Sequence, residues 1–151
     1  MSLDGDDRRF LFDAIELSRS APSSTAAYSV GCVIVGADDR VIATGYSRER
    51  GAQAHAEQVA IEKASEADAI LEGATLYTSL EPCSVRGSGL RACTWRIIDA
   101  HISRVVFAMR EPSLFVEGRG AEVLAEHGVD VVEIPDLAEA VALINAHLAV
   151  R

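Results

Sequence analysis

The stretch Ala74-Thr-Leu-Tyr-Thr-Ser79 decides the fold class, because it begins a regular alternation of strand and helix. Its β-branched and aromatic residues favour a strand. After a loop from Glu81 to Leu90, residues 91–100 are predicted to form a helix and Arg104-Val-Val-Phe-Ala108 the next strand. Strands that alternate with helices pair in parallel, and their helices cover both faces of the sheet. This half of the chain therefore predicts an α/β fold.

The segments on either side of this stretch extend the pattern. Apolar spacing predicts helices and short apolar runs predict strands, with turn residues between them. The expected elements are a helix over 7–19, a hairpin over 30–44, a helix over 54–69, a helix over 121–127, a strand over 129–133 and a last helix from 135 to about 148. Gly128 is expected to end the helix over 121–127.

Length and composition indicate one globular domain, residues 1–151. Apolar residues make up 49% and charged residues 25% of the chain, which is typical of a folded, water-soluble protein. The net charge is −9, from 14 basic and 23 acidic residues, and only 5% of residues are aromatic. An acidic surface repels phosphate backbones, and few aromatic rings are available to stack on bases. We therefore expect no nucleic-acid partner.

The cellular setting is predicted from the first residues and the cysteines. The first twenty residues carry too many charges for a signal peptide, and no apolar run of about 18 residues could span a membrane. The three cysteines, Cys32, Cys83 and Cys93, are an odd number. They favour metal binding or thiol chemistry in a reducing cytoplasm over a disulfide framework. Cys32 lies inside an apolar run and is expected in the core.

Two further residues, His55 and Glu57, carry the candidate chemistry together with Cys83 and Cys93. His55 and Glu57 lie at the start of a predicted helix, Cys83 follows Pro82 in a loop, and Cys93 lies in the first turn of the next helix. One imidazole and two thiolates are three ligands for Zn²⁺ and leave a fourth position for water, as a catalytic site requires. The alternative is a core histidine with two inert buried thiols.

Glu57 is two residues from His55, so it can lie near the metal without binding it. Zinc lowers the pKa of bound water to about 7, and a neighbouring carboxylate can carry the proton from that water to the substrate. We therefore expect Glu57 to be the catalytic residue.

The motif His55-Ala-Glu57, followed by Pro82-Cys83 and by Cys93, resembles the signature of the zinc-dependent nucleobase deaminases. The resemblance implies that His55, Cys83 and Cys93 bind one Zn²⁺ and that Glu57 shuttles the proton. It also implies a cytidine-deaminase-like fold, a three-layer α-β-α sandwich with a mixed central sheet of about five strands.

Nine residues separate Cys83 from Cys93, where cytidine and nucleic-acid deaminases have two. With Thr78-Ser-Leu-Glu-Pro-Cys-Ser84, Gly73-Ala-Thr-Leu-Tyr77 and Gly118-Arg-Gly120, this spacing is similar to the pyrimidine deaminase domain of riboflavin biosynthesis. The resemblance implies a hydrolase that acts on C–N bonds in cyclic amidines. Its substrate would be a diaminopyrimidine ribosyl phosphate or a related amino-heterocycle, and ammonia would be released. A reductase domain, which often accompanies the family, is not expected within 151 residues.

The chain departs from that family in the predicted substrate pocket. Ala27 stands where the family has Asn, and Ser47 and Val85 stand where it has His. The family's Gly-Arg-Thr-Pro-Pro loop is replaced by residues 86–92. Buried polar contacts often decide specificity, so these changes bear on which ring the site accepts.

Six residues are candidate substrate contacts. Gly31 and Ser79 are expected to position the ring, and Tyr28 either stacks on it or packs on the surface. Glu81 either lines the pocket or is a solvated charge. Arg86 and Arg91 have the geometry to bind a phosphate, or else are loop charges that face solvent.

Two other function classes remain open. One is a deaminase of another substrate, either a purine or nucleoside or a tRNA or DNA, and a basic groove beside the zinc site would favour the nucleic acid. The other is a non-catalytic zinc-binding module, which a fourth protein ligand would favour. Related deaminases commonly form dimers or tetramers, so the resemblance also implies a homo-oligomer. The cysteines and the lack of a long apolar run predict a cytoplasmic protein without a membrane partner.

Overall fold

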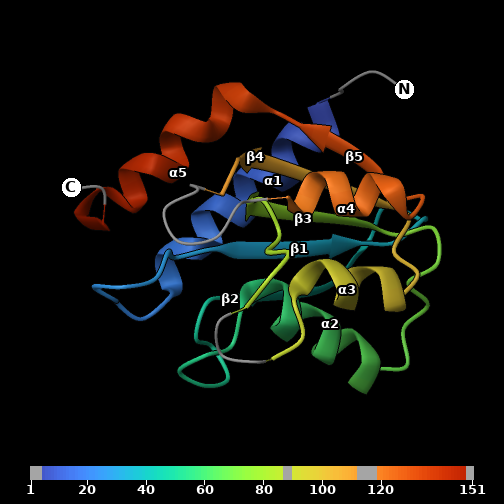
Figure 1. Cartoon of the computed structure of the whole chain (residues 1–151). Helices are drawn as coiled ribbons and strands as arrows, with labels where there is room; N and C mark the ends of the chain where they lie inside the picture. Colours follow the sequence, from blue (N-terminus) through green and yellow to red (C-terminus); the bar gives the residue numbers. More distant parts are fainter. Residues whose placement is uncertain (1–4, 87–89, 112–118, 149–151) are drawn as a thin grey trace.

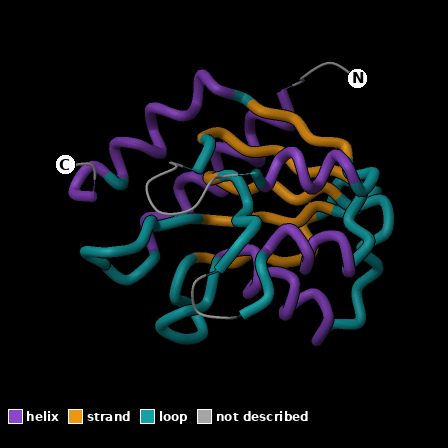
Figure 2. Tube along the Cα trace, viewed as in Figure 1, coloured by secondary structure: helices purple, strands orange, loops and turns teal. Residues whose placement is uncertain are grey.

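The computed structural model describes residues 5–86, 90–111 and 119–148; positions 87–89 of the insert and Gly118 lie outside the described residues. Strands and helices alternate along most of the chain (Figures 1 and 2). The strands are β1 (Gly31–Val35), β2 (Val41–Tyr46), β3 (Thr75–Leu80), β4 (Arg104–Met109) and β5 (Asp130–Glu133). The helices are α1 (Gly5–Leu17), α2 (Ala56–Glu66), α3 (Cys93–Asp99), α4 (Gly120–Glu126) and α5 (Ala138–Ile144), with short 3₁₀ turns η1 (Ser18–Ser20), η2 (Pro135–Leu137) and η3 (Ala146–Leu148).

The five described strands form one mixed sheet in the order β2-β1-β3-β4-β5. β1 pairs antiparallel with both β2 and β3, whereas β3, β4 and β5 pair in parallel. α3 connects β3 to β4 and α4 connects β4 to β5, and such crossovers are what parallel pairing requires. The predicted hairpin and the predicted parallel half are both confirmed.

Helices cover the two faces of the sheet, which confirms the three-layer sandwich. Side chains alternate along β1, so that Cys32 packs toward α2 and α3 while Val33 packs toward α1. Figure 1 shows α1 and α5 on one side of the sheet and α2 and α3 on the other. Cys32 is fully buried in the first of these two cores, as expected.

The segment predicted to form one continuous last helix is interrupted in the structure. It is divided into η2, α5 and η3, and α5 ends before Asn145. The buried Asn145 side chain accepts a hydrogen bond from the Ser29 N–H at 2.7 Å and donates one to the Ser29 carbonyl at 3.3 Å. This tertiary pairing fixes the end of the helix to the loop before β1, which periodicity alone could not indicate.

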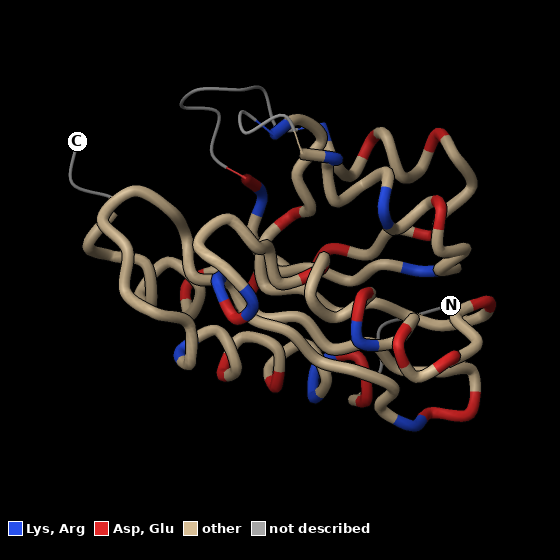
Figure 3. The backbone as a smooth tube through the Cα atoms, turned by 90° about the horizontal axis from the view of Figure 1, so that it is seen from below, with Lys and Arg blue, Asp and Glu red and all other residues tan. Residues whose placement is uncertain are grey.

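Acidic and basic residues are interspersed along the chain (Figure 3). Among the described residues, no helix has both the length and the apolar character needed to cross a bilayer.

Candidate metal centre and active site

Three segments that are distant in sequence bring His55, Cys83 and Cys93 together. His55 precedes α2, Cys83 follows β3, and Cys93 is the first residue of α3. The Nδ1 atom of His55 lies 3.6 Å from the Sγ atom of Cys83 and 3.5 Å from that of Cys93. The three ligand atoms all lie within 4.8 Å of one another, so they can bind a single ion.

Two glycines allow the backbones that carry these ligands to approach closely. A Cβ atom on Gly45 in β2 would lie 2.4 Å from the carbonyl oxygen of Ala56, so the first turn of α2 packs directly on β2. A Cβ atom on Gly120, the first residue of α4, would lie 1.8 Å from the carbonyl oxygen of Pro82. Neither space accommodates a side chain. The main chain beside His55 and beside Cys83 is therefore held by direct backbone contact.

The donor set fits Zn²⁺. The Cys93 N–H donates a hydrogen bond to the Cys83 Sγ at 3.2 Å. The pKa of Cys83 is lowered to about 4, first by its hydrogen bond with the Cys93 thiol, against the effect of burial. The pKa of Cys93 is raised by that same hydrogen bond and by burial, and the charge of Arg86 acts in the opposite direction. Two sulfurs close enough to share a proton, beside one imidazole, are typical of a three-ligand zinc site.

Glu57 lies in the first turn of α2, two residues after His55, and is only 4% exposed. Its Oε2 atom accepts a hydrogen bond from the Thr78 hydroxyl at 2.8 Å. Burial raises the pKa of Glu57, and the nearby His55 and the Thr78 hydrogen bond lower it in part. Glu57 is therefore a buried carboxylate near the candidate metal ligands, with a stronger tendency to accept a proton than a solvated one.

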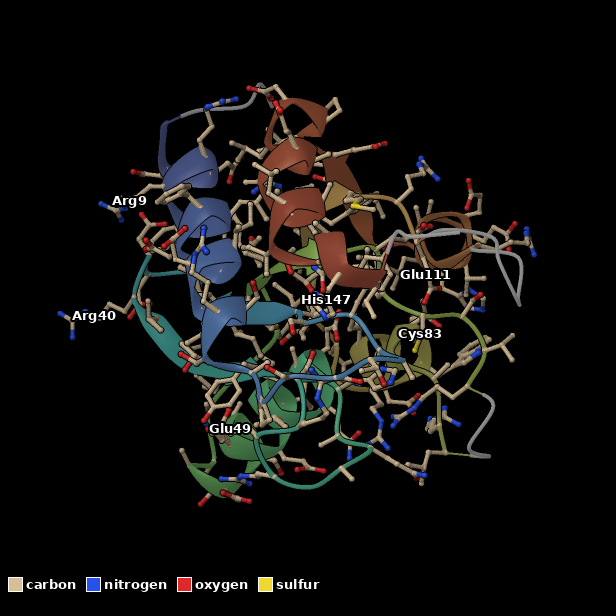
Figure 4. All side chains as sticks on the ribbon, turned by 90° about the vertical axis from the view of Figure 1, so that its left-hand side faces the viewer. Arg9, Arg40, Glu49, Cys83, Glu111 and His147 are labelled. Carbon is tan, nitrogen blue, oxygen red and sulfur yellow. The ribbon has the colours of Figure 1, made fainter. Side chains whose placement is uncertain are left out.

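Two more carboxylates lie where the parallel strands β3 and β4 end, the edge at which ligands bind in such sheets. Glu81 is buried, and its two oxygens accept the N–H of Glu111 at 3.0 Å and the N–H of Ala121 at 2.9 Å. It thus joins β4 to α4. Glu111 is half-buried on the same side as Cys83 (Figure 4).

Sequence reasoning did not single out Glu111. Burial raises its pKa to about 7, and the negative charges of Cys83, Glu81 and Glu57 act in the same direction. Its position at the end of a predicted parallel strand was the signal that could have identified it.

The other predicted contacts lie at the start of β1 and the end of β3. The Gly31 N–H donates to the Ser79 Oγ at 3.1 Å, so these two predicted residues are brought together. Tyr28 is half-buried and packs against the core on the α2 side. Where the related family has His, the buried Ser47 hydroxyl accepts the Val30 N–H at 2.8 Å.

Two other single-residue departures from that family lie at exposed positions. Ala27 is exposed, and the Val85 side chain is 56% exposed.

Both predicted arginines contact other parts of this chain. Arg91 forms an ion pair with Asp99, with 2.6 Å between Nη2 and Oδ2. Arg86 is half-buried and donates hydrogen bonds to Gln58 and to the main-chain carbonyls of Gln53 and Arg91. Binding of a phosphate by either arginine stays a prediction, and it would have to compete with these contacts.

The family follows from a comparison with known protein families. Residues 4–109 match the model of the cytidine and deoxycytidylate deaminase zinc-binding region. The chain belongs to this deaminase family. The matched region contains His55, Cys83 and Cys93, and the zinc dependence of the family agrees with the metal site that these residues form. The resemblance stated from the sequence is thereby confirmed.

Relatives of this deaminase domain come from riboflavin biosynthesis. The chain is 38% identical over 127 residues to the diaminohydroxyphosphoribosylamino-pyrimidine deaminase of Schizosaccharomyces pombe, covering 82% of this chain and 31% of that protein. It is 36% identical over 129 residues to the riboflavin biosynthesis protein RibD of Escherichia coli, covering 83% and 33%. The chain therefore spans about a third of the length of these curated relatives.

Solved structures agree on the fold. The bifunctional deaminase and reductase of Thermotoga maritima superposes with a TM-score of 0.82 at 36% identity, covering 92% of this chain and 39% of that one. The Aspergillus oryzae Rib2 deaminase, in complex with DARIPP, gives a TM-score of 0.82 at 23% identity, with 93% and 90% covered. This second likeness concerns the fold alone.

Proposed function

We propose that this chain is a zinc-dependent hydrolytic deaminase of an amino-substituted pyrimidine of the riboflavin-precursor type. The observation that carries the proposal is the position of Glu57, a buried carboxylate near three residues that can bind one metal ion. The relatives that are 36% to 38% identical are named for deamination of a phosphoribosylamino-pyrimidine or for riboflavin biosynthesis. The reaction replaces an exocyclic C–NH₂ group by C=O, consumes one water and releases ammonia.

His55, Cys83 and Cys93 would hold the Zn²⁺, which when bound supplies a Lewis acid that activates water at neutral pH. Glu57 accepts a proton at its carboxylate and returns it to the substrate as the C–N bond breaks. The Thr78 hydroxyl fixes the orientation of that carboxylate, since it donates to Oε2. Burial supports this role because it raises the pKa of Glu57 and so makes it a better proton acceptor.

The pocket for the ring is proposed between the start of β1 and the ends of β3 and β4. Gly31 and Ser79 would form its floor, and Tyr28 would cover the ring. Glu81 would act by holding the main chain of Glu111 and Ala121 in place. Arg91 would contact a substrate phosphate only by leaving Asp99, and Arg86 only by giving up its contacts within the chain.

We place this enzyme in the cytoplasm as a homo-oligomer with one deaminase domain per chain. Three free cysteines are suited to a reducing compartment, and the resemblance to oligomeric deaminases supports the assembly. Light scattering of the purified protein measures its mass in solution, and a monomeric mass would contradict the assembly.

The test is ammonia release by the zinc-loaded protein across aminopyrimidines, aminopurines, their ribosides and their phosphates. We expect the highest kcat/KM on a diaminopyrimidine ribosyl phosphate or its dephosphorylated form, and turnover lower by about 10²- to 10⁴-fold with the matched Glu57→Gln protein. If the protein prefers a purine, a nucleoside or an RNA, that class replaces the amino-substituted pyrimidine as its substrate. No ammonia from any compound would overturn the enzymatic proposal.

A further inference from the structure

The Arg86 guanidinium contacts the chain segments that carry His55 and Cys93, and Arg86 itself belongs to the segment that carries Cys83. Its Nη2 atom donates to the Gln53 carbonyl at 2.6 Å, and its Nη1 atom donates to the Gln58 Oε1 at 3.0 Å. The same Nη1 atom donates to the Arg91 carbonyl at 3.2 Å. Gln53 lies two residues before His55 and Gln58 three residues after it, while Arg91 lies two residues before Cys93.

Arg86 itself is three residues after Cys83. We infer that Arg86 is a positioning residue of the metal centre: its planar guanidinium joins the His55, Cys83 and Cys93 segments in the arrangement that binds one ion. Arginine suits this task because its fork presents several donors in one fixed plane.

Arg86 is connected to His55 through the side chain of Gln58. The Gln58 Oε1 atom that accepts from Arg86 also accepts the His55 N–H at 3.4 Å. The amide cannot easily turn, because its Nε2 atom donates to the Glu62 Oε2 at 3.2 Å on the next turn of α2. Arg86 and Gln58 therefore hold the residue from which the imidazole projects.

The burial of the guanidinium supports the same role. The Arg86 Nε atom is buried and has no hydrogen-bond partner among the described residues, so this edge of the guanidinium is enclosed by protein. The side chain is therefore held in place on this edge by packing and on its other edge by hydrogen bonds.

Zinc affinity tests this inference without reference to turnover. Wild type, Arg86→Ala, Arg86→Lys and Arg91→Ala are loaded with zinc and titrated with a chromogenic chelator. Residues that orient metal ligands typically contribute about 10- to 100-fold in affinity, so Arg86→Ala is expected to lose that much. Arg86→Lys keeps the charge but not the fork, and it is expected to remain at least tenfold weaker than wild type.

Arg91→Ala is the matched control. It removes a positive charge from the same insert but keeps the main-chain carbonyl that Arg86 contacts, so its zinc affinity is expected within about twofold of wild type. An Arg86→Ala protein with wild-type affinity overturns the inference. Full recovery in Arg86→Lys overturns the positioning role and leaves only an effect of charge.

Two further measurements keep the result clear. If Arg86→Ala does not fold, Gln58→Leu removes the acceptor shared by Arg86 and His55 without changing the charge; it is expected to weaken zinc binding, and wild-type affinity contradicts the inference. The inference rests on the metal site of the proposed function, yet its readout needs no substrate. A wild-type protein that binds zinc but deaminates nothing would refute the proposed function and leave this comparison intact.

Discussion

The Thr78 hydroxyl donates a 2.8 Å hydrogen bond to the Glu57 carboxylate, and both side chains are buried. Thr78 lies in β3, and Glu57 lies in the first turn of α2. The bond connects the central sheet to the helix that begins beside His55. A buried carboxylate with one fixed oxygen is oriented before any substrate arrives, which lowers the cost of reorganisation during proton transfer.

Thr78→Val removes this hydrogen bond and keeps the shape of the side chain. The bond lowers the pKa of Glu57, so its loss raises that pKa further and leaves less of the ionised base at a given pH. We expect kcat to fall about tenfold at pH 7, to recover in part as the pH rises, and to be largely retained in Thr78→Ser. A pH–rate profile of the three proteins measures the effect; coincident profiles would contradict it.

Glu57→Gln removes the proton acceptor and leaves the three metal ligands in place. We expect the zinc content of the wild type and a fall in turnover of about 10²- to 10⁴-fold, the usual contribution of general acid–base catalysis. Ammonia assays and metal analysis of the same sample separate the two effects. Turnover close to that of the wild type would exclude Glu57 as the proton carrier.

Cys83→Ala removes one of three metal ligands. Metal analysis is expected to give about one zinc per wild-type chain and much less in the variant, because three protein ligands define the site. A bound metal also stabilises the folded state, so chelation should lower the melting temperature of the wild type and change that of Cys83→Ala much less. Equal shifts in the two proteins would place the metal elsewhere.

Gly120→Ala introduces a Cβ atom where the Pro82 carbonyl oxygen already lies, at 1.8 Å. The carbonyl oxygen is part of the main chain and the Cβ atom is bonded to it, so rotating a side chain cannot relieve the strain. We expect a loss of about 3 kcal/mol in the free energy of unfolding, together with weaker zinc binding because Cys83 follows Pro82. Gly5→Ala is the control, since nothing lies within 4 Å of the added carbon. Equal denaturation midpoints for the two variants would refute the expected clash.

Asp7→Asn tests an ion pair on the opposite face of the sheet. Asp7 Oδ2 lies 2.6 Å from Arg104 Nη2, and its Oδ1 accepts from the Tyr77 hydroxyl at 2.7 Å. The substitution leaves the largely buried Arg104 with only its longer pairing to the exposed Asp130, at 3.6 Å, so we expect a loss of about 3 kcal/mol at pH 7.

The pH dependence of that loss follows from the pKa of Asp7, which is lowered chiefly by its hydrogen bond with Arg104. A carboxyl whose folded pKa is depressed stabilises the protein above its unfolded pKa of about 3.9 and loses this contribution as the pH falls through the folded pKa. The stability difference between Asp7→Asn and wild type should therefore be constant near pH 7 and shrink below about pH 4. Denaturation at several pH values measures it, and a difference independent of pH would contradict the linkage.

Residue type and spacing were enough to predict the strands, the three metal ligands and Glu57. Short apolar runs indicate strands that are buried between two helical layers. The ability of His and Cys to bind a metal, and of Glu to accept a proton, is set by the residue type itself. The Glu111 environment could not be predicted in this way, because its raised pKa arises from burial and from charges on segments that follow other strands.

The amino-acid sequence by itself determined the α/β class and indicated the candidate metal ligands, since hydrophobic periodicity and donor chemistry are local properties of the chain. Only the tertiary structure decided that Arg86, three residues after Cys83, contacts the segments of His55 and Cys93 and that Asn145, at the end of α5, pairs with Ser29. The physical reason is that a polar side chain takes whichever partners folding brings within reach. Those partners can lie more than a hundred residues away.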